Sequence, residues 1–205
     1  MLMDYQREVE SITKWLGTGS INIFGLPYSG KDTIGSALAN MLGAEFLSSG
    51  RLLRNYGEKD QEVGILSPTD VFCKVVLPAF FDENYSGKPL ILSTVGRSSG
   101  EEYKVIETAE KSGHPIKAVL YVEITEEEIY RRLNAAYELG DRTGRVDDSR
   151  EIIKTRLDEF NTKTLPVINT YRGKGLVIDI DGMGEREKVM ERVVKKLYLF
   201  TKSNN

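Results

Sequence analysis

The chain has 205 residues, 40% of them hydrophobic and 29% charged. At about 150 residues per domain, this length and mixture predict one soluble globular domain over residues 1–205. The 28 Lys and Arg residues nearly balance the 31 Asp and Glu residues, which excludes a typical net-basic nucleic-acid-binding domain. The single cysteine, Cys73, excludes an intrachain disulfide and a zinc site built from several cysteines, and it fits the cytoplasm. No apolar run approaches the ~18 residues of a membrane span, and the polar first residues do not resemble a signal peptide.

Short apolar runs alternate with amphipathic stretches along the chain, a pattern that predicts a parallel sheet covered by helices on both faces. A proline lies inside each of two predicted helices, at Pro78 and Pro166, and we expect a break or bend at both. The three glutamates at 126–128 are expected to form a solvated helix start. We expect helices over residues 4–16, 31–42, 69–84, 100–112, 125–139, 148–171 and 186–198, strands over 21–24, 90–92, 119–124 and 176–180, and a loop entering a short helix over 47–56.

The segment from Gly25 to Lys31 satisfies the pattern Gly-x4-Gly-Lys between a predicted strand and a predicted helix. This context is the one that supports a phosphate-binding loop. The backbone N–H groups of such a loop point inward at phosphate oxygens, and the next helix presents its positive N-terminus to the same anion. Tyr28, inside the loop, either covers the nucleotide entrance or is a surface aromatic residue.

Several further segments resemble the adenylate kinase family of nucleoside monophosphate kinases over about residues 20–200. Residues 25–33 are similar to that family's GxPGSGKGT loop, and residues 48–54 to its STGDLLR segment. Residues 64–68 are similar to the strip that lies against the acceptor base. The strongest likeness is at residues 144–148, which read Gly-Arg-Val-Asp-Asp and are followed by Glu151 and Arg156.

The resemblance implies a P-loop NTPase fold, three-layer α/β/α with a five-stranded parallel sheet. It implies a core over residues 1–47, 88–138 and 148–205, an insert for the nucleoside monophosphate over 48–87 and a short lid over 139–147. The implied reaction moves the γ-phosphate of ATP, as its Mg²⁺ complex, to a nucleoside monophosphate, with AMP as the expected acceptor. We expect a monomer that binds neither nucleic acid nor a membrane.

The resemblance also implies the residues of the site. On ATP it places Gly25, Pro27, Ser29, Gly30, Lys31, Asp32, Thr33 and Arg132. On the acceptor it places Ser49, Gly50, Arg54, Ile65, Leu66, Arg97 and Glu101. The catalytic set is Lys31, Arg97, Arg145 and Arg156, and the lid set is Arg142, Asp147 and Asp148. Arginine suits such sites because its planar fork binds pairs of phosphate oxygens and never deprotonates.

One departure from the family concerns the metal. Where the family carries the acid of a DGFPR segment, this chain has Ser93, although Arg97 keeps the arginine of that segment. In the family that acid helps to hold the Mg²⁺ ion through its water shell. Asp32 follows the loop lysine, and we hypothesise that it supplies the missing carboxylate. The alternative is an acid in the first helical turn that faces solvent.

Two other departures concern the nucleotides. Ala136 replaces a lid arginine, and Arg142 is a candidate substitute. Glu101 replaces the glutamine that pairs with adenine, and a one-residue slip of the alignment would place Glu102 there. A carboxylate only accepts hydrogen bonds, so it suits guanine better than adenine. A kinase for GMP or a deoxynucleoside monophosphate therefore stays open, as does a catalytically weak nucleotide-binding module.

Overall fold

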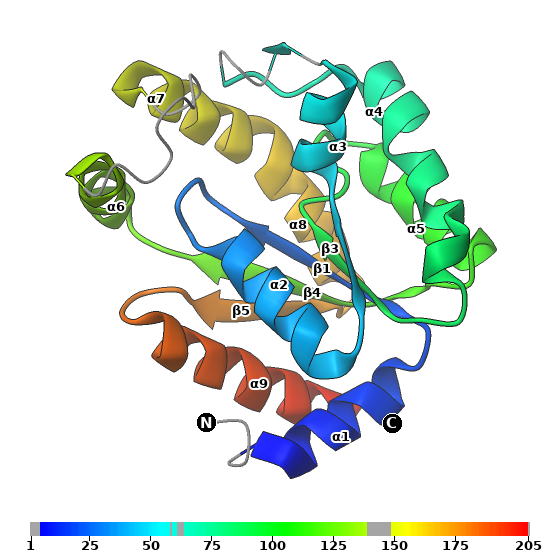
Figure 1. The fold of residues 1–205 in the computed structure, drawn as a ribbon. Coiled ribbons are helices and arrows are strands. Elements are labelled where there is room, and N and C mark those ends of the chain that lie inside the picture. The colour runs from blue at the N-terminus through cyan, green and yellow to red at the C-terminus, as the bar shows by residue number, and fades with distance from the viewer. Residues whose placement is uncertain (1–4, 58, 61–63, 139–148, 205) are drawn as a thin grey trace.

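The computed structural model describes residues 5–57, 59–60, 64–138 and 149–204. Five strands form one parallel sheet in the order β2-β3-β1-β4-β5, as expected (Figure 1). The central strand β1 pairs with β3 and β4, so that Ile23 lies opposite both Ser93 and Leu120. The strands are β1 (Ser20–Gly25), β2 (Glu45–Ser48), β3 (Leu90–Ser93), β4 (Ile116–Glu123) and β5 (Val177–Asp181).

Helices cover both faces of this sheet (Figure 1). Alternate residues of β1 point to opposite faces, because side chains alternate along a strand. Ile21 and Ile23 pack with α1, α2 and α9, whereas Phe24 packs with α8. The helices are α1 (Gln6–Leu16), α2 (Lys31–Leu42), α3 (Ser49–Tyr56), α4 (Thr69–Val75), α5 (Glu101–Lys111), α6 (Glu126–Glu138), α7 (Arg150–Glu159), α8 (Leu165–Gly173) and α9 (Arg186–Ser203).

The predicted elements agree with these bounds to within three residues at each end, with two exceptions: α9 continues to Ser203, five residues past its predicted end, and one strand was not predicted. Residues 45–48, expected to lead into a loop, form the edge strand β2, which is too short to show a period in the sequence. The break expected at Pro78 is confirmed, since α4 ends at Val75 and a 3₁₀ turn covers Leu77–Phe81. The irregularity expected at Pro166 is also present, because a π-helical turn at Phe160–Thr164 divides the long helix just before it. Such turns occur often at functional sites.

Residues of the insert predicted over 48–87 pack on β3 and α5 through a hydrophobic cluster that includes Leu53, Phe72 and Phe80. Because all strands are parallel, the carboxyl ends of β1 and β3 meet at one edge of the sheet, where open α/β sheets bind ligands. No helix in the described part of the chain is both long and apolar enough to cross a membrane. The whole of the predicted lid, residues 139–147, lies outside the described residues.

Candidate active site

The loop between β1 and α2 is built around a sharp turn of the backbone. Tyr28 and Gly30 both have left-handed backbone angles, with φ of 60° and 83°. A Cβ atom on Gly25 would lie 2.6 Å from the Ser29 Oγ, so the start and the end of the loop are in close contact. Ser29 is only 2% exposed, and its Oγ makes no hydrogen bond to any described residue. A buried hydroxyl without a partner costs about 1–3 kcal/mol, and a ligand oxygen in the loop would satisfy it.

Among the described residues, eight lysine and arginine side chains line one cavity of about 1290 Å³ beside this loop, and they include four from four different segments for which the sequence predicts phosphate contacts. These four are Lys31, Arg54, Arg97 and Arg156. Burial, together with the positive charges of Arg156 and Arg54, lowers the pKa of Arg97 to about 10. The negative charges of Glu101 and Asp32 oppose this lowering of the pKa. Cations held this close favour an anionic ligand, because an anion between them removes their mutual repulsion.

The acceptor residues expected from the sequence meet the same loop. Ser49, Gly50 and Arg54 line the large cavity, and the Ser49 hydroxyl donates a 2.7 Å hydrogen bond to the Thr94 carbonyl. Ile65 and Leu66 line a smaller cavity of about 50 Å³, which Arg97 and Arg156 also line.

The strip at Gly64–Leu66 is attached to the core through α7. The backbone N–H of Leu66 donates to a Glu159 carboxylate oxygen at 2.9 Å, and a Cβ on Gly64 would lie 2.9 Å from the Ile152 carbonyl. The Lys163 ammonium also holds the pKa of Glu159 below its usual range, against the opposing effect of burial. Glu159 was not predicted from the sequence, because its partner lies 93 positions away.

Glu101 lies apart from both cavities. Its carboxylate is 2% exposed and accepts hydrogen bonds from the backbone N–H groups of Arg97 and Ser98 and from the Thr69 hydroxyl. Glu102, also buried, accepts from the Gly100 N–H and the Thr170 hydroxyl. Neither acid is among the residues that line the two cavities.

Asp32 and Ser93 meet where the first turn of α2 faces the end of β3. The Ser93 hydroxyl donates a hydrogen bond to the Asp32 Oδ1. The carboxylate therefore lies beside the strand end that lacks an acid, and both residues line the large cavity. Among the described residues no group of three or more His, Cys, Asp or Glu side chains could by itself hold a metal ion.

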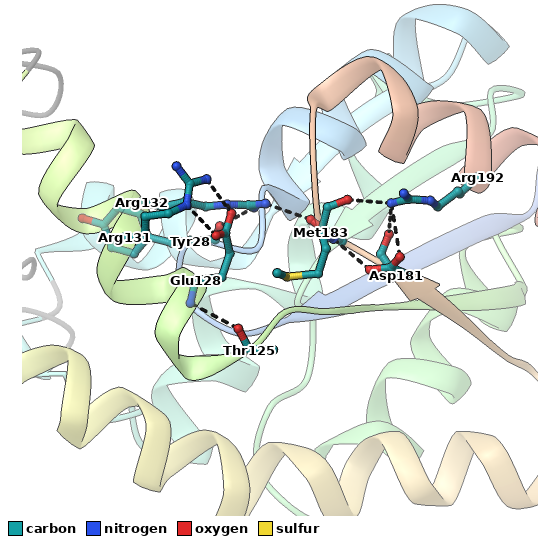
Figure 2. Close-up of polar contacts among 9 residues, drawn as sticks. Tyr28, Thr125, Glu128, Arg131, Arg132, Asp181, Met183 and Arg192 are labelled. Carbon is teal, nitrogen blue, oxygen red and sulfur yellow. Dashed lines mark hydrogen bonds and ion pairs between the residues drawn. The ribbon is translucent and has the colours of Figure 1, made fainter.

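Arg132, expected on the donor phosphates, forms hydrogen bonds to three segments of the protein (Figure 2). Its guanidinium donates to the Tyr28 carbonyl at 3.0 Å, to the Gly182 carbonyl at 2.9 Å and to Glu128 at 2.7 Å. It thereby ties the phosphate loop to α6 and to the turn after β5. The ring of Tyr28, partly buried, packs against the cluster around Ile129 and also lines the cavity, so it is not simply a surface aromatic residue.

The expectation that the glutamates at 126–128 are all solvated is wrong for Glu128, which is only 7% exposed. Hydrogen bonds from Arg131 and then Arg132 outweigh burial and lower its pKa to about 2, which keeps the carboxylate charged at neutral pH. The available sequence signal was the spacing of three and four residues between this acid and the two arginines, which places them on one helix face.

Comparison with known proteins agrees with this geometry. A family model described as adenylate kinase matches residues 23–176. The chain belongs to the adenylate kinase family. An adenylate kinase of Bacteroides fragilis is 30% identical over 186 residues, covering 86% of this chain and 96% of the relative. Adenylate kinase isoenzyme 1 of Gallus gallus is 32% identical over 187 residues, covering 86% and 93%.

For this member of the adenylate kinase family, all residues expected on ATP line the large cavity except Gly25, which lines the smaller one. Ala136, where the family pattern has an arginine, lines the large cavity as well. The expected catalytic residue Arg145 and the expected lid residues Arg142, Asp147 and Asp148 lie outside the described residues.

Proposed function

We propose that this chain catalyses reversible transfer of the γ-phosphate from ATP to AMP, giving two ADP, as a cytoplasmic monomer. The observation that carries the proposal is the meeting of Lys31, Arg54, Arg97 and Arg156 at one cavity beside the phosphate loop. Transfer between two nucleotides brings about four phosphates together, and catalysis depends on neutralising and aligning them. The names of the relatives support AMP as the acceptor.

In this mechanism the phosphate loop and Lys31 hold the β- and γ-phosphates of ATP. Arg54 and Arg97 hold the phosphate of AMP, whose oxygen attacks the γ-phosphorus. The new P–O bond forms as the bond to the β,γ-bridging oxygen breaks, and the leaving oxygen stays on ADP. Arg156 lines both cavities and stabilises the charge on the phosphoryl group in transit.

The residues present fit a hydrated Mg²⁺ ion. Mg²⁺ in such sites is bound by one or two carboxylates together with substrate phosphates, and it keeps several waters. When bound, the ion neutralises charge on the β- and γ-phosphates. Asp32 would supply one carboxylate to its water shell, and the Ser93 hydroxyl, which donates a hydrogen bond to that carboxylate, would help to hold it there.

The proposed function is tested by a coupled assay of ADP formation with ATP and each of AMP, GMP, CMP, UMP and dAMP. We expect the highest kcat/KM with AMP. A clear preference for GMP or dAMP would replace the acceptor but keep the reaction class. Binding of ATP and every acceptor without turnover would instead favour the nucleotide-binding module and overturn the proposal.

The role of Asp32 has its own test. We expect Asp32→Ala to raise the Mg²⁺ concentration for half-maximal activity at least tenfold, because the metal shell loses its carboxylate. Ser93→Asp added to that variant returns an acid to the end of β3 and should restore most of the affinity. Ser93→Ala keeps the Asp32 carboxylate and removes only its hydrogen-bond donor, so it should raise the Mg²⁺ requirement less than threefold, well below the effect of Asp32→Ala. An unchanged Mg²⁺ requirement in Asp32→Ala would contradict the assignment.

A further inference from the structure

The loop from Ser93 to Arg97 has an irregular backbone, and it places the Arg97 side chain at the cavity. Thr94 and Gly96 both have left-handed backbone angles, with φ of 52° and 78°. A left-handed threonine is rare and costly, so surrounding contacts have to maintain it. The segment reads Ser-Thr-Val-Gly-Arg and contains no proline to restrict it. The contacts made by neighbouring side chains therefore determine where Arg97 lies.

Three buried side chains from other elements bind the backbone of this loop. The Ser49 hydroxyl, on α3, donates to the Ser93 carbonyl at 3.3 Å and to the Thr94 carbonyl at 2.7 Å, and so holds the start of the loop. The Asn22 amide, on β1, donates to the Val95 carbonyl at 2.8 Å and accepts from the Val95 N–H at 3.2 Å. The Glu101 carboxylate, at the start of α5, accepts from the Arg97 N–H at 2.8 Å and the Ser98 N–H at 3.0 Å through the same oxygen. Asn22 thus fixes the middle of the loop and Glu101 fixes its end.

The other oxygen of Glu101 accepts a 2.9 Å hydrogen bond from the Thr69 hydroxyl, at the start of α4 in the acceptor insert. Both carboxylate oxygens are therefore engaged inside the protein, and the residue is 2% exposed. A base edge would have to displace Thr69 or the loop backbone to reach this carboxylate. Its buried negative charge also opposes the effect of Arg156 and Arg54 on the pKa of Arg97.

We propose that Glu101 is a positioning residue that holds the backbone of Arg97, and through it the acceptor phosphate, and that it does not read the acceptor base. This inference rests on the proposed function, because it assigns Arg97 to the acceptor phosphate. It separates two roles that the same position could have: a positioning residue acts equally on all acceptors, whereas a base contact acts on some acceptors more than others.

The test compares Glu101→Ala and Glu101→Gln with the parent in the full chain. Glutamine has nearly the same shape, so its oxygen can accept from both N–H groups while its amide N–H₂ donates to the Thr69 hydroxyl oxygen. We expect Glu101→Ala to raise the KM for AMP at least tenfold with the KM for ATP changed less than twofold. We expect Glu101→Gln to stay within threefold of the parent and to keep the same order of preference among AMP, GMP, CMP and UMP.

A double-mutant cycle with Arg97→Ala distinguishes an effect through Arg97 from a general loss of structure. It compares the loss of AMP binding caused by Glu101→Ala with and without the Arg97 side chain. If Glu101 acts through Arg97, Glu101→Ala should cause less than a twofold further loss of AMP binding once Arg97 is absent. Additive losses would overturn the proposal. A changed order of acceptors in Glu101→Gln would also overturn it and would favour base reading. If thermal melts show that Glu101→Ala does not fold, the Glu101→Gln variant alone tests the proposal. The test is then whether this variant keeps the parent's order of preference among the acceptor nucleotides.

The same variants are measured for AMP and GMP binding by calorimetry without ATP. If the parent binds nucleoside monophosphates but transfers no phosphate, the proposed function fails while the calorimetric comparison still tests Glu101. If the parent turns over and the order of acceptors changes in Glu101→Gln, the function stands and the positioning role fails.

Discussion

Arg156→Ala is expected to lower kcat for ADP formation from ATP and AMP by about 10³-fold, at the lower end of the range for an arginine that stabilises a transferring phosphoryl group. Arg156 lies on α7 and lines both cavities, each of which is also lined by Lys31, expected on the donor side, and by Arg97, expected on the acceptor side. Because charge redistributes between these two sides during transfer, its loss should affect kcat more than the KM of either substrate. Steady-state kinetics, with each substrate varied while the other is saturating, measure the change in kcat and in the KM of ATP and of AMP separately.

Lys154→Ala on the same helix is the matched control, because Lys154 is exposed and lines neither cavity. We expect its kcat to stay within twofold of the parent. Arg156→Lys should fall between the two, since it keeps the charge but loses the planar fork that binds two phosphate oxygens. A kcat within tenfold of the parent in Arg156→Ala would remove Arg156 from the catalytic set.

The features that the sequence predicted best are local ones. The phosphate loop depends on residues within seven consecutive positions, and the boundaries of α2 at Lys31 and Leu42 agree with the prediction. The edge strand β2 was missed because four residues, two of them partly exposed, are too few to distinguish a strand from a loop. Its pairing with β3, far along the chain, is what makes it a strand.

The side chains that hold the site together depend on long-range contacts, which residue spacing does not reveal. Asn22 and Val95 lie 73 positions apart, and Thr69 and Glu101 lie 32 apart. Family resemblance placed Glu101 beside a base, yet its carboxylate binds the neighbouring loop. Asp32 was predictable in a different way, because the sequence lacks an acid at Ser93 and has an additional one at Asp32. The structure brings these two residues into contact, while the role of Asp32 toward Mg²⁺ stays a prediction.

Gly25→Ala should both destabilise the protein and abolish tight ATP binding. The added Cβ would lie 2.6 Å from the Ser29 Oγ and 2.7 Å from the Val122 carbonyl oxygen on β4. The carbonyl belongs to the central sheet and cannot move away, so the loop has to shift. Inserting one methyl group into a well-packed region costs about 1–3 kcal/mol, and a chain of this size loses about 2–4 °C in Tm for each kcal/mol.

Gly173→Ala is the matched control for this prediction. Gly173 is the last residue of α8, and apart from its chain neighbours and the backbone of its own helix no heavy atom lies within 4 Å of its added Cβ. Since alanine restricts the unfolded chain more than glycine does, we expect an unchanged or slightly higher Tm and unchanged ATP binding. The measurements are thermal melts and calorimetric titration with ATP. An affinity for ATP in Gly25→Ala equal to that of the parent would show that the loop geometry at Gly25 does not govern phosphate binding, and the donor site would have to be sought elsewhere along the cavity.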